Sequence, residues 1–434
     1  MNQFLEKRFK LSEFHTNVKT ECLAGLTTFV TMAYVLATVP NILAGAGLDK
    51  HVMLTVMVML IILTSCAMAL YTNRPFALAP GLGSVGIVAS MISNEGIPAP
   101  IAAGVIFWSG ILFILISFLG LREAVVRVIP VSLKHAVTAG IGLFIALLGA
   151  KGCGLIVANA KKNTLAFGDL TAPSVLVCVI GFIILLLMKV RSVPGGMILT
   201  ILITTVIGIP FGVTKLPERI FSMPADISTQ FLNVDFLGAL DFAYIPFLIA
   251  LFVPDFFSTF GTVLGVGAKA GYLDEDGNLP GIDRCFQVDA VATSFGALFG
   301  MPSMTTYLES SAGVEAGGKT GLSVVFTSGF FALALFFAPL ALIIPSAATA
   351  PVLIFIGINM LSGMRNVNYS DITEYIPAFI CVTFTIFANN IANGICAALP
   401  AYLIMKLAAG QGRKVSPVMY VLVAVCMLYF YTII

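Results

Sequence analysis

Charged side chains are scarce in this sequence. Asp, Glu, Lys and Arg make up 10% of its 434 residues, whereas about 25% is usual for a soluble domain. The net charge is only +2, which gives no reason to expect an acidic partner such as nucleic acid. Hydrophobic residues make up 59%, and they gather in runs of the length that a bilayer requires, about 20 residues per helix. The composition therefore predicts an all-α polytopic membrane protein.

Patterns typical of metal sites and of catalysis are also missing. The three histidines, His15, His51 and His135, lie far apart, and the eight cysteines form no CxxC pair. We therefore expect neither a metal site nor disulfides. There is no Walker motif for ATP and no evident nucleophile with its base. Residues 1–20 are polar and charged, unlike the apolar core of a cleavable signal peptide. The sequence predicts a protein that is not an enzyme and needs no cofactor.

Apolar segments separated by polar or turn-forming residues recur along the chain. There are 14 of them: 22–46, 52–71, 76–93, 100–120, 131–150, 172–188, 195–213, 242–266, 286–300, 302–316, 321–344, 347–361, 372–388 and 391–408. A further run, 416–433, is either another span or a helix on the membrane surface. With the N-terminus inside, 17 of the 23 Lys and Arg residues fall on the cytoplasmic side and 6 on the outer side. This asymmetry predicts a cytoplasmic N-terminus.

The segments divide into two halves that echo each other. Residues 1–213 and 242–415 each hold seven segments, residues 214–241 form a polar connection, and 416–434 is a C-terminal apolar segment. An odd number of spans per half makes the second half inverted relative to the first, as in many secondary transporters. The third segment of each half is short and interrupted by Pro, Gly and hydroxyl residues: FALAPGLGSVG (76–86) and GMPSMTTYLESSAG (300–313). Broken helices at membrane depth are tolerated where they line a polar cavity, so we expect a binding site there.

Four acidic residues fall within or beside the predicted spans of the second half, where ionisable groups usually have a function. Glu309 follows the interruption of the tenth span, and its carboxylate suits the N–H edge of a flat heterocycle. Asp255 either carries a proton or braces a helix break at Pro254. We interpret Asp289 as structural, paired with a neighbouring helix, and Glu315 as solvated near the membrane edge.

Several strings are together specific to one family. They are HTNVKTECLAGLTTFVTMAYVL, PFALAPGLGS, SLKHAVTAGIGLFIALLG, TFGTVLGVGAKAGYLDEDGNLPG, TTYLESSAGVEAGGKTGL and PSAATAPVLIFIG. Along essentially its whole length the chain resembles the nucleobase–cation symporter-2 family, the xanthine/uracil permeases. Within it, the chain is most similar to the azaguanine-type guanine/hypoxanthine/adenine permease branch.

This resemblance implies a 7+7 inverted-repeat transporter with a core domain of spans 1–4 and 8–11 and a gate domain of spans 5–7 and 12–14. It also implies that the substrate is held between these domains, beside short extended stretches in the third and tenth spans, and that the tenth-span carboxylate binds the base. The candidate substrate-binding residues are Glu309, Ser258, Tyr307, Leu308, Thr306, Ser84, Val85, Gly83 and Thr28. Glu309 and Asp255 are the candidates for proton coupling.

Two positions depart from the branch pattern. Ser258 stands where the eighth span usually has a second acid, and Val85 stands where the third span usually has Asn. An acid and an amide are the kind of polar group that discriminates between similar ligands. These departures leave xanthine, urate and uracil as alternatives to the purines of the branch.

We therefore expect a permease of the cytoplasmic membrane that imports adenine, guanine or hypoxanthine by alternating access. The expected partners are the lipid bilayer, a proton or sodium ion for coupling, and a second copy of the chain in a homodimer. An anion transporter of related architecture is a weaker alternative, because the broken segments carry no cationic group. A channel and a membrane enzyme are weaker still.

Overall fold

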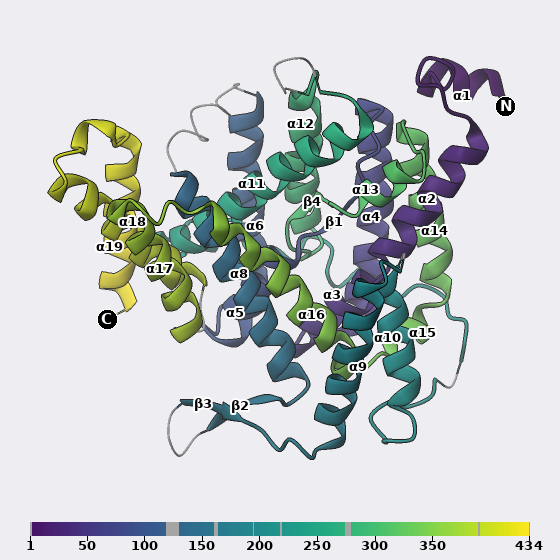
Figure 1. The fold of residues 1–434 in the computed structure, drawn as a ribbon, viewed down its shortest axis with the longest axis horizontal. Coiled ribbons are helices and arrows are strands. Elements are labelled where there is room, and N and C mark those ends of the chain that lie inside the picture. Colours follow the sequence, from purple (N-terminus) through teal and green to yellow (C-terminus); the bar gives the residue numbers. More distant parts are fainter. Residues whose placement is uncertain are drawn as a thin grey trace.

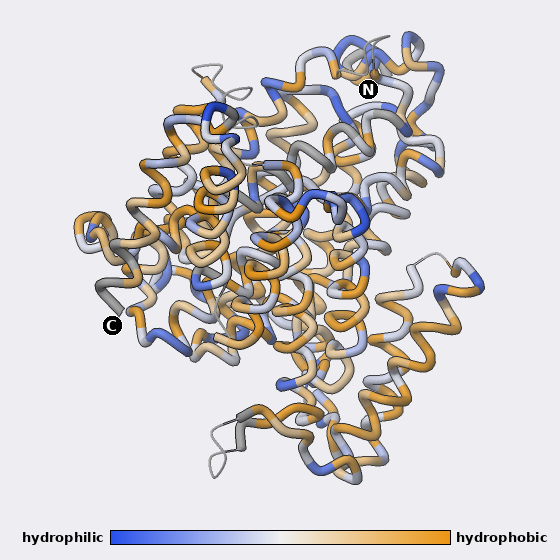
Figure 2. Tube along the Cα trace, turned by 60° about the vertical axis from the view of Figure 1, so that its left-hand side comes forward, coloured by the Kyte–Doolittle hydropathy of each residue, from blue (hydrophilic) through white to orange (hydrophobic). Residues whose placement is uncertain are grey.

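The computed structural model describes residues 2–118, 130–159, 164–193, 195–217, 219–273, 279–388 and 391–433. They form a bundle of helices with two pairs of short strands (Figure 1). The helices are predominantly hydrophobic, whereas much of the hydrophilic chain lies in loops and at helix ends (Figure 2). By length and composition, six helical stretches of these residues can cross a membrane: Val18–Gly45, Lys50–Thr72, Ala99–Phe118, Val131–Gly152, Pro173–Val190 and Ser346–Asn366.

The first half of the chain contains these elements: α1 (Asn2–Phe9), α2 (Val18–Met32), α3 (Val35–Gly45), α4 (Lys50–Thr72), β1 (Leu78–Pro80), α5 (Leu82–Ser93), α6 (Ala99–Phe118), α8 (Val131–Gly152), β2 (Ile156–Asn159), β3 (Thr164–Phe167), α9 (Pro173–Val190) and α10 (Gly196–Ile207). The second half contains η1 (Gly238–Leu240), η2 (Phe242–Tyr244), α11 (Ile245–Ala270), α12 (Ile282–Ala297), β4 (Met304–Thr306), α13 (Ser310–Glu315), α14 (Gly321–Phe336), α15 (Ala338–Leu342), α16 (Ser346–Leu361), η3 (Ser362–Asn366), α17 (Ile372–Phe387), α18 (Ile391–Ala408), η4 (Gly412–Lys414) and α19 (Pro417–Ile433).

Most predicted segments coincide with one helix or with a strand followed by a helix, although residues 119–120 of the fourth lie outside the described chain. The segment 321–344 instead contains two helices, α14 and α15, which Phe337 separates. The first segment is divided into α2 and α3 by a short turn at Ala33 and Tyr34. Pro40, which lacks the N–H that a helix interior needs, lies within α3. The sequence did not predict the antiparallel pair of β2 and β3, which follows α8. It also suggested a break at Pro254, but α11 is one helix from Ile245 to Ala270.

The two interrupted segments meet in the middle of the molecule (Figure 1). β1 pairs antiparallel with β4, with Ala79 opposite Thr305. The pairing extends beyond the strands, because the Gly81 N–H donates to the Ser303 carbonyl and the Tyr307 N–H donates to the Ala77 carbonyl, both at 2.9 Å. Each strand thereby satisfies the backbone groups that the interruption of the other leaves free, as burial in a membrane protein requires. The helices α5 and α13 begin just beyond these strands.

The remaining helices pack around this strand pair in two sets. α14 packs against α2 and α4, and α12 packs against α6 and α4. On the other side, α16 packs against α8 and α9, and α17 packs against α8 and α18. The crossing of α8 and α16 is close because both helices present glycine: a Cβ built on Gly357 would lie 2.4 Å from the Gly142 carbonyl oxygen. Small residues at such crossings allow membrane helices to approach through their backbones.

Candidate functional site

A cavity of about 420 Å³ opens where the strand pair meets the second set of helices. This volume falls in the range of small-molecule sites, about 300–1,000 Å³. It is lined by Tyr34, Gly81, Leu82, Gly83, Ser84, Thr138, Ile141, Leu251, Asp255, Ser258, Thr262, Thr305, Thr306, Tyr307, Leu308, Glu309 and Met360. The two interrupted segments form one wall, α11 forms a second, and α8 and α16 contribute Thr138, Ile141 and Met360.

Glu309 supplies a carboxylate to this cavity. It occupies the N-cap position of α13, but its side chain makes no capping hydrogen bond to that helix. Instead, its Oε1 accepts a hydrogen bond of 2.9 Å from the hydroxyl of Tyr34. Tyr34 lines the same cavity but is only 3% exposed, so the hydroxyl that holds the carboxylate is largely shielded from solvent. The remaining acceptor capacity of the carboxylate is available to a ligand that carries N–H groups.

The opposite part of the same wall offers hydrogen-bond donors. Gly81 is the N-cap of α5, and the first intrahelical bond of this helix runs from the Val85 N–H to the Gly81 carbonyl. The backbone N–H groups of Leu82, Gly83 and Ser84 therefore have no intrahelical acceptor. A cavity with carboxylate acceptors on one side and backbone donors on the other suits a planar heterocycle that has both kinds of group along its edges.

One face of α11 lines the cavity with three polar side chains. Asp255, Ser258 and Thr262 are spaced three and four residues apart, which places them on the same side of a helix. Ser258 is exposed and Asp255 is only 6% exposed. Ser258 thus lines the cavity with an exposed side chain, whereas Asp255 lies deeper.

Tyr307 connects the two interrupted segments. Its hydroxyl donates to the carbonyl of Pro80 at 2.6 Å, and its backbone lies at the end of the strand pair. Thr305 and Thr306 of β4 also reach the cavity. These contacts fix the position of Glu309 relative to α5, because β4, which leads to Glu309, is paired with β1, which leads to α5.

Seven of the nine predicted substrate-binding residues line the cavity, and two do not. Val85 is fully buried away from it. Thr28 is 4% exposed on α2, and its hydroxyl lies so close to Gly313 that a Cβ there would be 2.1 Å away. Thr28 therefore packs α2 against α13.

The other two predicted acids lie outside the cavity. Asp289 is fully buried and accepts a hydrogen bond of 2.7 Å from Thr259 of the neighbouring α11, in keeping with the predicted pairing between helices. Glu315 is exposed and forms an ion pair with Lys269.

Sequence analysis missed several residues of the cavity. Tyr34, Thr138, Ile141, Thr262 and Met360 all line it. A tyrosine hydroxyl inside an otherwise apolar segment was a signal for Tyr34, because buried tyrosines usually find a hydrogen-bond partner. Ile141 and Met360 carry no such signal, since apolar residues are ordinary in membrane helices.

Several known proteins resemble this chain along most of its length. A model described as a permease family, that of xanthine and uracil permeases, matches residues 19–396. An adenine permease of Escherichia coli (strain K12) is 37% identical and covers 95% of this chain and 93% of its own length. A guanine/hypoxanthine permease of Bacillus subtilis (strain 168) is 34% identical, with 95% and 97% covered.

Among solved structures, the transmembrane domain of a cyanobacterial bicarbonate transporter has a TM-score of 0.63 at 17% identity, covering 89% of this chain and 97% of that one. A murine solute carrier 26 anion transporter in the inward-facing state has a TM-score of 0.64 at 11% identity, covering 91% and 69%. These likenesses concern the fold alone, and they confirm the predicted 7+7 inverted repeat. The family consists of transporters and not of enzymes. The chain is a multi-pass membrane protein, and it belongs to the xanthine/uracil permease family.

Proposed function

We propose that this protein is a secondary transporter that imports a purine-type nucleobase, namely adenine, guanine or hypoxanthine, across the cytoplasmic membrane. The observation that carries the proposal is Glu309, which Tyr34 holds at the cavity wall opposite the N–H groups of α5 that have no acceptor within that helix. A purine has ring N–H groups for the carboxylate and ring nitrogens for the backbone donors. The names of the relatives, an adenine permease and a guanine/hypoxanthine permease, support the same class of substrate.

Transport follows alternating access in this proposal. The core domain contains α2–α6 and α11–α15, and the gate domain contains α8–α10 and α16–α18. The cavity lies between residues of both groups, so a movement of one group against the other exposes it to either side of the membrane. A proton supplies the driving force, with Glu309 and Asp255 as candidate carriers. A sodium ion is the alternative coupling ion.

The arrangement in the membrane is part of the proposal. The N-terminus is cytoplasmic, as the excess of Lys and Arg on that side supports, and two copies associate through their gate domains. Labelling of single cysteines in α1 by an impermeant maleimide, before and after lysis, tests the first point. Cross-linking of the protein in native membranes tests the second.

Other planar heterocycles form the second candidate class. Ser258 lines the cavity at the position where the family resemblance leads us to expect a second acid of the eighth span. A hydroxyl both donates and accepts hydrogen bonds, whereas an ionised acid only accepts them. This chemistry also suits xanthine, urate or uracil. The Ser258→Asp variant is expected to change the order of preference among bases or the dependence of uptake on pH.

Uptake of labelled bases tests the function as a whole. The chain is expressed in a strain that lacks its own base permeases, and uptake of adenine, guanine, hypoxanthine, xanthine, urate and uracil is measured with and without each unlabelled competitor. We expect saturable uptake of at least one purine. If no base enters faster than in the empty strain, although the protein is in the membrane, the proposal is wrong.

A further inference from the structure

A second hollow, a groove of about 630 Å³, runs along the surface between α4 and α12 and shares no residue with the cavity described above. Its walls are largely apolar and include Leu63 and Leu70 of α4 and Val291 and Phe295 of α12, with Phe118 of α6 at its edge. These five side chains are 37% to 61% exposed. In a multi-pass membrane protein such a surface faces the lipid chains, which are as apolar as leucine.

The polar side chains of the groove show which way it runs. Tyr71 and Gln287 lie together at one end, where the tyrosine hydroxyl donates to the amide oxygen Oε1 at 3.2 Å. Thr64, the third polar side chain of the lining, donates instead to the Leu60 carbonyl of its own helix at 2.7 Å. Tyrosines are enriched at the interface between membrane and water. The groove therefore leads from this interface toward the bilayer centre.

The length of the groove matches one leaflet of a bilayer. From Gln287 to Phe295, α12 rises about 12 Å, at about 1.5 Å per residue. Half of a hydrocarbon core of about 30 Å is about 15 Å. The groove is thus long enough to hold most of one acyl chain of a lipid whose head group lies beside Gln287.

Two arginines lie at the polar end of the groove. Arg284 precedes Val288 by one turn of α12, on the same side of the helix, and its guanidinium lies 5.9 Å from the ring centre of Tyr71. Arg74 follows the end of α4 and donates to the carbonyl of Pro280, just before α12, at 3.2 Å. Both helices that form the groove therefore place a cation at the same end of it.

The charge at this end favours an anionic head group. Within the described residues, neither Arg74 nor Arg284 forms an ion pair with an acid. Asp283 lies on another side of α12, since successive helical residues are about 100° apart, and the acidic residues 274–276 lie outside the described chain. A guanidinium binds the oxygens of a phosphate through two parallel hydrogen bonds.

The arginines lie on the side of the molecule that carries the N-terminus. Asn73, the residue before Arg74, donates to the carbonyl of Phe9 at the end of α1 at 3.0 Å. In the proposed orientation this side is cytoplasmic. Anionic lipids give the cytoplasmic leaflet its negative surface potential, and basic sites between helices on that side bind their head groups.

We propose that this groove binds one anionic phospholipid of the cytoplasmic leaflet, with an acyl chain between α4 and α12 and its phosphate at Arg284. The groove belongs to the first set of helices, so the proposed dimer through the gate domains leaves it open to lipid. The inference goes beyond the proposed function, and only the choice of leaflet rests on the proposed orientation.

The bound lipid supports the strand pair from behind. On the side of α4 away from the groove, the Ser65 hydroxyl accepts from the N–H of Leu78 at 2.9 Å and donates to its carbonyl at 3.1 Å. On the corresponding side of α12, Thr293 donates to the carbonyl of Met304 at 3.1 Å. β1 and β4 are thus held by the two helices between which the lipid lies, so the lipid should stabilise the folded chain.

Photolabelling tests the occupant of the groove directly. The purified full chain in detergent is irradiated with phosphatidylglycerol that carries a diazirine in its acyl chain, and the labelled peptides are identified by mass spectrometry. Labels should concentrate on α4 and α12 beside the groove. Unlabelled phosphatidylglycerol should compete at least about fivefold better than phosphatidylcholine, the effect of one basic group at a membrane surface. Equal competition, or a groove without label because a second copy covers it, would overturn the inference.

Variants separate the head group from the acyl chain. Arg284→Ala should lower labelling by phosphatidylglycerol about fivefold, and Arg284→Lys, which keeps the charge, should retain most of it. Arg191→Ala removes an exposed arginine at the end of α9 and is the matched control. Ala67→Trp places an indole ring in the groove and should reduce labelling whatever the head group; Val291→Phe replaces it if that variant does not fold. Wild-type labelling of Arg284→Ala or of a folded groove-filling variant would show that the lipid lies elsewhere.

Thermal unfolding provides a readout that does not depend on labelling or on transport. Phosphatidylglycerol should raise the melting temperature of the wild type and of Arg191→Ala more than phosphatidylcholine does. Arg284→Ala should lose this difference between the two lipids. If it keeps the full difference, the anionic lipid acts at another site and the inference is wrong. Because no base is present, a failure of base uptake would leave this result unaffected.

Discussion

At the scale of single residues, the hydrogen bond between Tyr34 and Glu309 is the central contact of the proposed binding site. It joins residues 275 positions apart in the chain, and both belong to the interrupted part of a span. The hydroxyl fixes one carboxylate oxygen and leaves the other for the ligand. Binding should therefore respond strongly to the charge of Glu309 and more weakly to the hydroxyl of Tyr34.

Replacement of Glu309 by Gln should abolish uptake. The amide keeps the shape of the side chain but loses the charge-assisted hydrogen bond to the base, which contributes about 1.5–3 kcal/mol, or about ten- to hundredfold in affinity. Equilibrium binding of labelled base to purified protein measures this loss. The matched control is Glu315→Gln, which changes an exposed acid that pairs with Lys269 and should bind like the wild type. Full uptake by Glu309→Gln would refute the role of this residue.

Replacement of Tyr34 by Phe should weaken binding of the base by about tenfold or less. The variant loses one hydrogen bond, about 0.5–1.5 kcal/mol, and leaves the carboxylate less well oriented. The loss should appear in the dissociation constant rather than in the amount of protein in the membrane. Tyr369→Phe alters an exposed tyrosine and serves as control. Equal affinities of Tyr34→Phe and the wild type would show that the hydroxyl does not orient Glu309.

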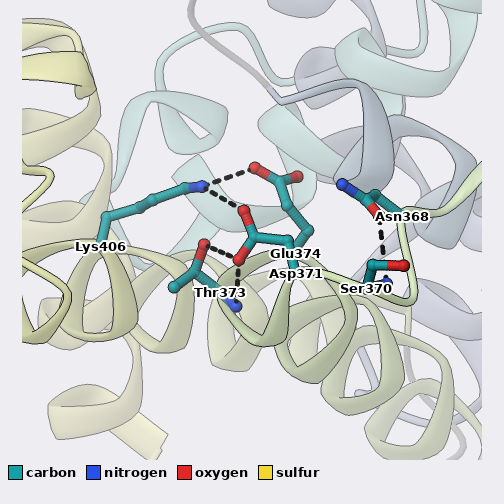
Figure 3. A network of polar contacts seen from close by, with 6 residues as sticks. All are labelled: Asn368, Ser370, Asp371, Thr373, Glu374 and Lys406. Carbon is teal, nitrogen blue, oxygen red and sulfur yellow. Dashed lines mark hydrogen bonds and ion pairs between the residues drawn. The ribbon is translucent and has the colours of Figure 1, made fainter.

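At the scale of helices, two contacts within the second set can be tested by substitution. One is the glycine crossing of α8 and α16. The other lies between α17 and α18, where Lys406 forms ion pairs with Glu374 at 2.8 Å and with Asp371 at 3.5 Å (Figure 3). Asp371 caps α17 by accepting hydrogen bonds from the backbone and the hydroxyl of Thr373. These hydrogen bonds, with a smaller effect of Lys406, lower the pKa of Asp371, so the carboxylate remains ionised and paired at neutral pH.

Replacement of Gly357 by Ala should destabilise the protein. Its added Cβ would lie 2.4 Å from the Gly142 carbonyl oxygen and 2.8 Å from the Cβ of Ala146, so the helices must separate. Overpacking of this kind costs about 1–3 kcal/mol. Thermal unfolding in detergent measures the change. Gly329→Ala is the control, because nothing lies within 4 Å of its Cβ. A melting temperature equal to that of the control would show that the crossing can relax without cost.

Replacement of Lys406 by Met should also lower stability. The ammonium group is buried, with its side chain 6% exposed, and its loss leaves Asp371 and Glu374 without their cationic partner. Removal of one member of a buried pair costs about 3–5 kcal/mol of stability. Because both acids are partly exposed, we expect the loss here to lie at or below the lower end of that range. Adding Asp371→Asn and Glu374→Gln should recover much of the loss. Lys10→Met removes an exposed pair with Glu13 and should change little. If the triple variant is no more stable than Lys406→Met, charge is not the cause.

At the scale of the whole molecule, both sets of helices contribute residues to the cavity wall. Gly83 of the first set lies next to Ile141 of the second. A Cβ on Gly83 would lie 3.1 Å from the Cγ2 of Ile141, so cysteines at these two positions are near enough for a disulfide. If transport requires the two sets to move apart, oxidation of the Gly83→Cys/Ile141→Cys protein should stop uptake and reduction should restore it. Each single variant should be insensitive to oxidant. Unchanged uptake by the fully oxidised protein would contradict alternating access between these surfaces.

The sequence alone determined the membrane class, the division into two halves, the interrupted third and tenth spans and the position of Glu309 beside one of them. All of these depend on local properties: the hydropathy of a segment, the Pro and Gly residues that end a helix, and the cost of an acid in an apolar run.

Only the tertiary structure decided which distant residues meet. It brings Tyr34 to Glu309 and pairs β1 with β4. It places Ile141 and Met360 in the cavity wall, whereas Thr28 and Val85 do not line the cavity. It also places Asp289 within hydrogen-bonding distance of Thr259 on the neighbouring α11. The physical reason is that such contacts depend on how helices far apart in the chain cross and rotate against one another. Packing between them sets these crossings, and no single segment encodes it in its own pattern.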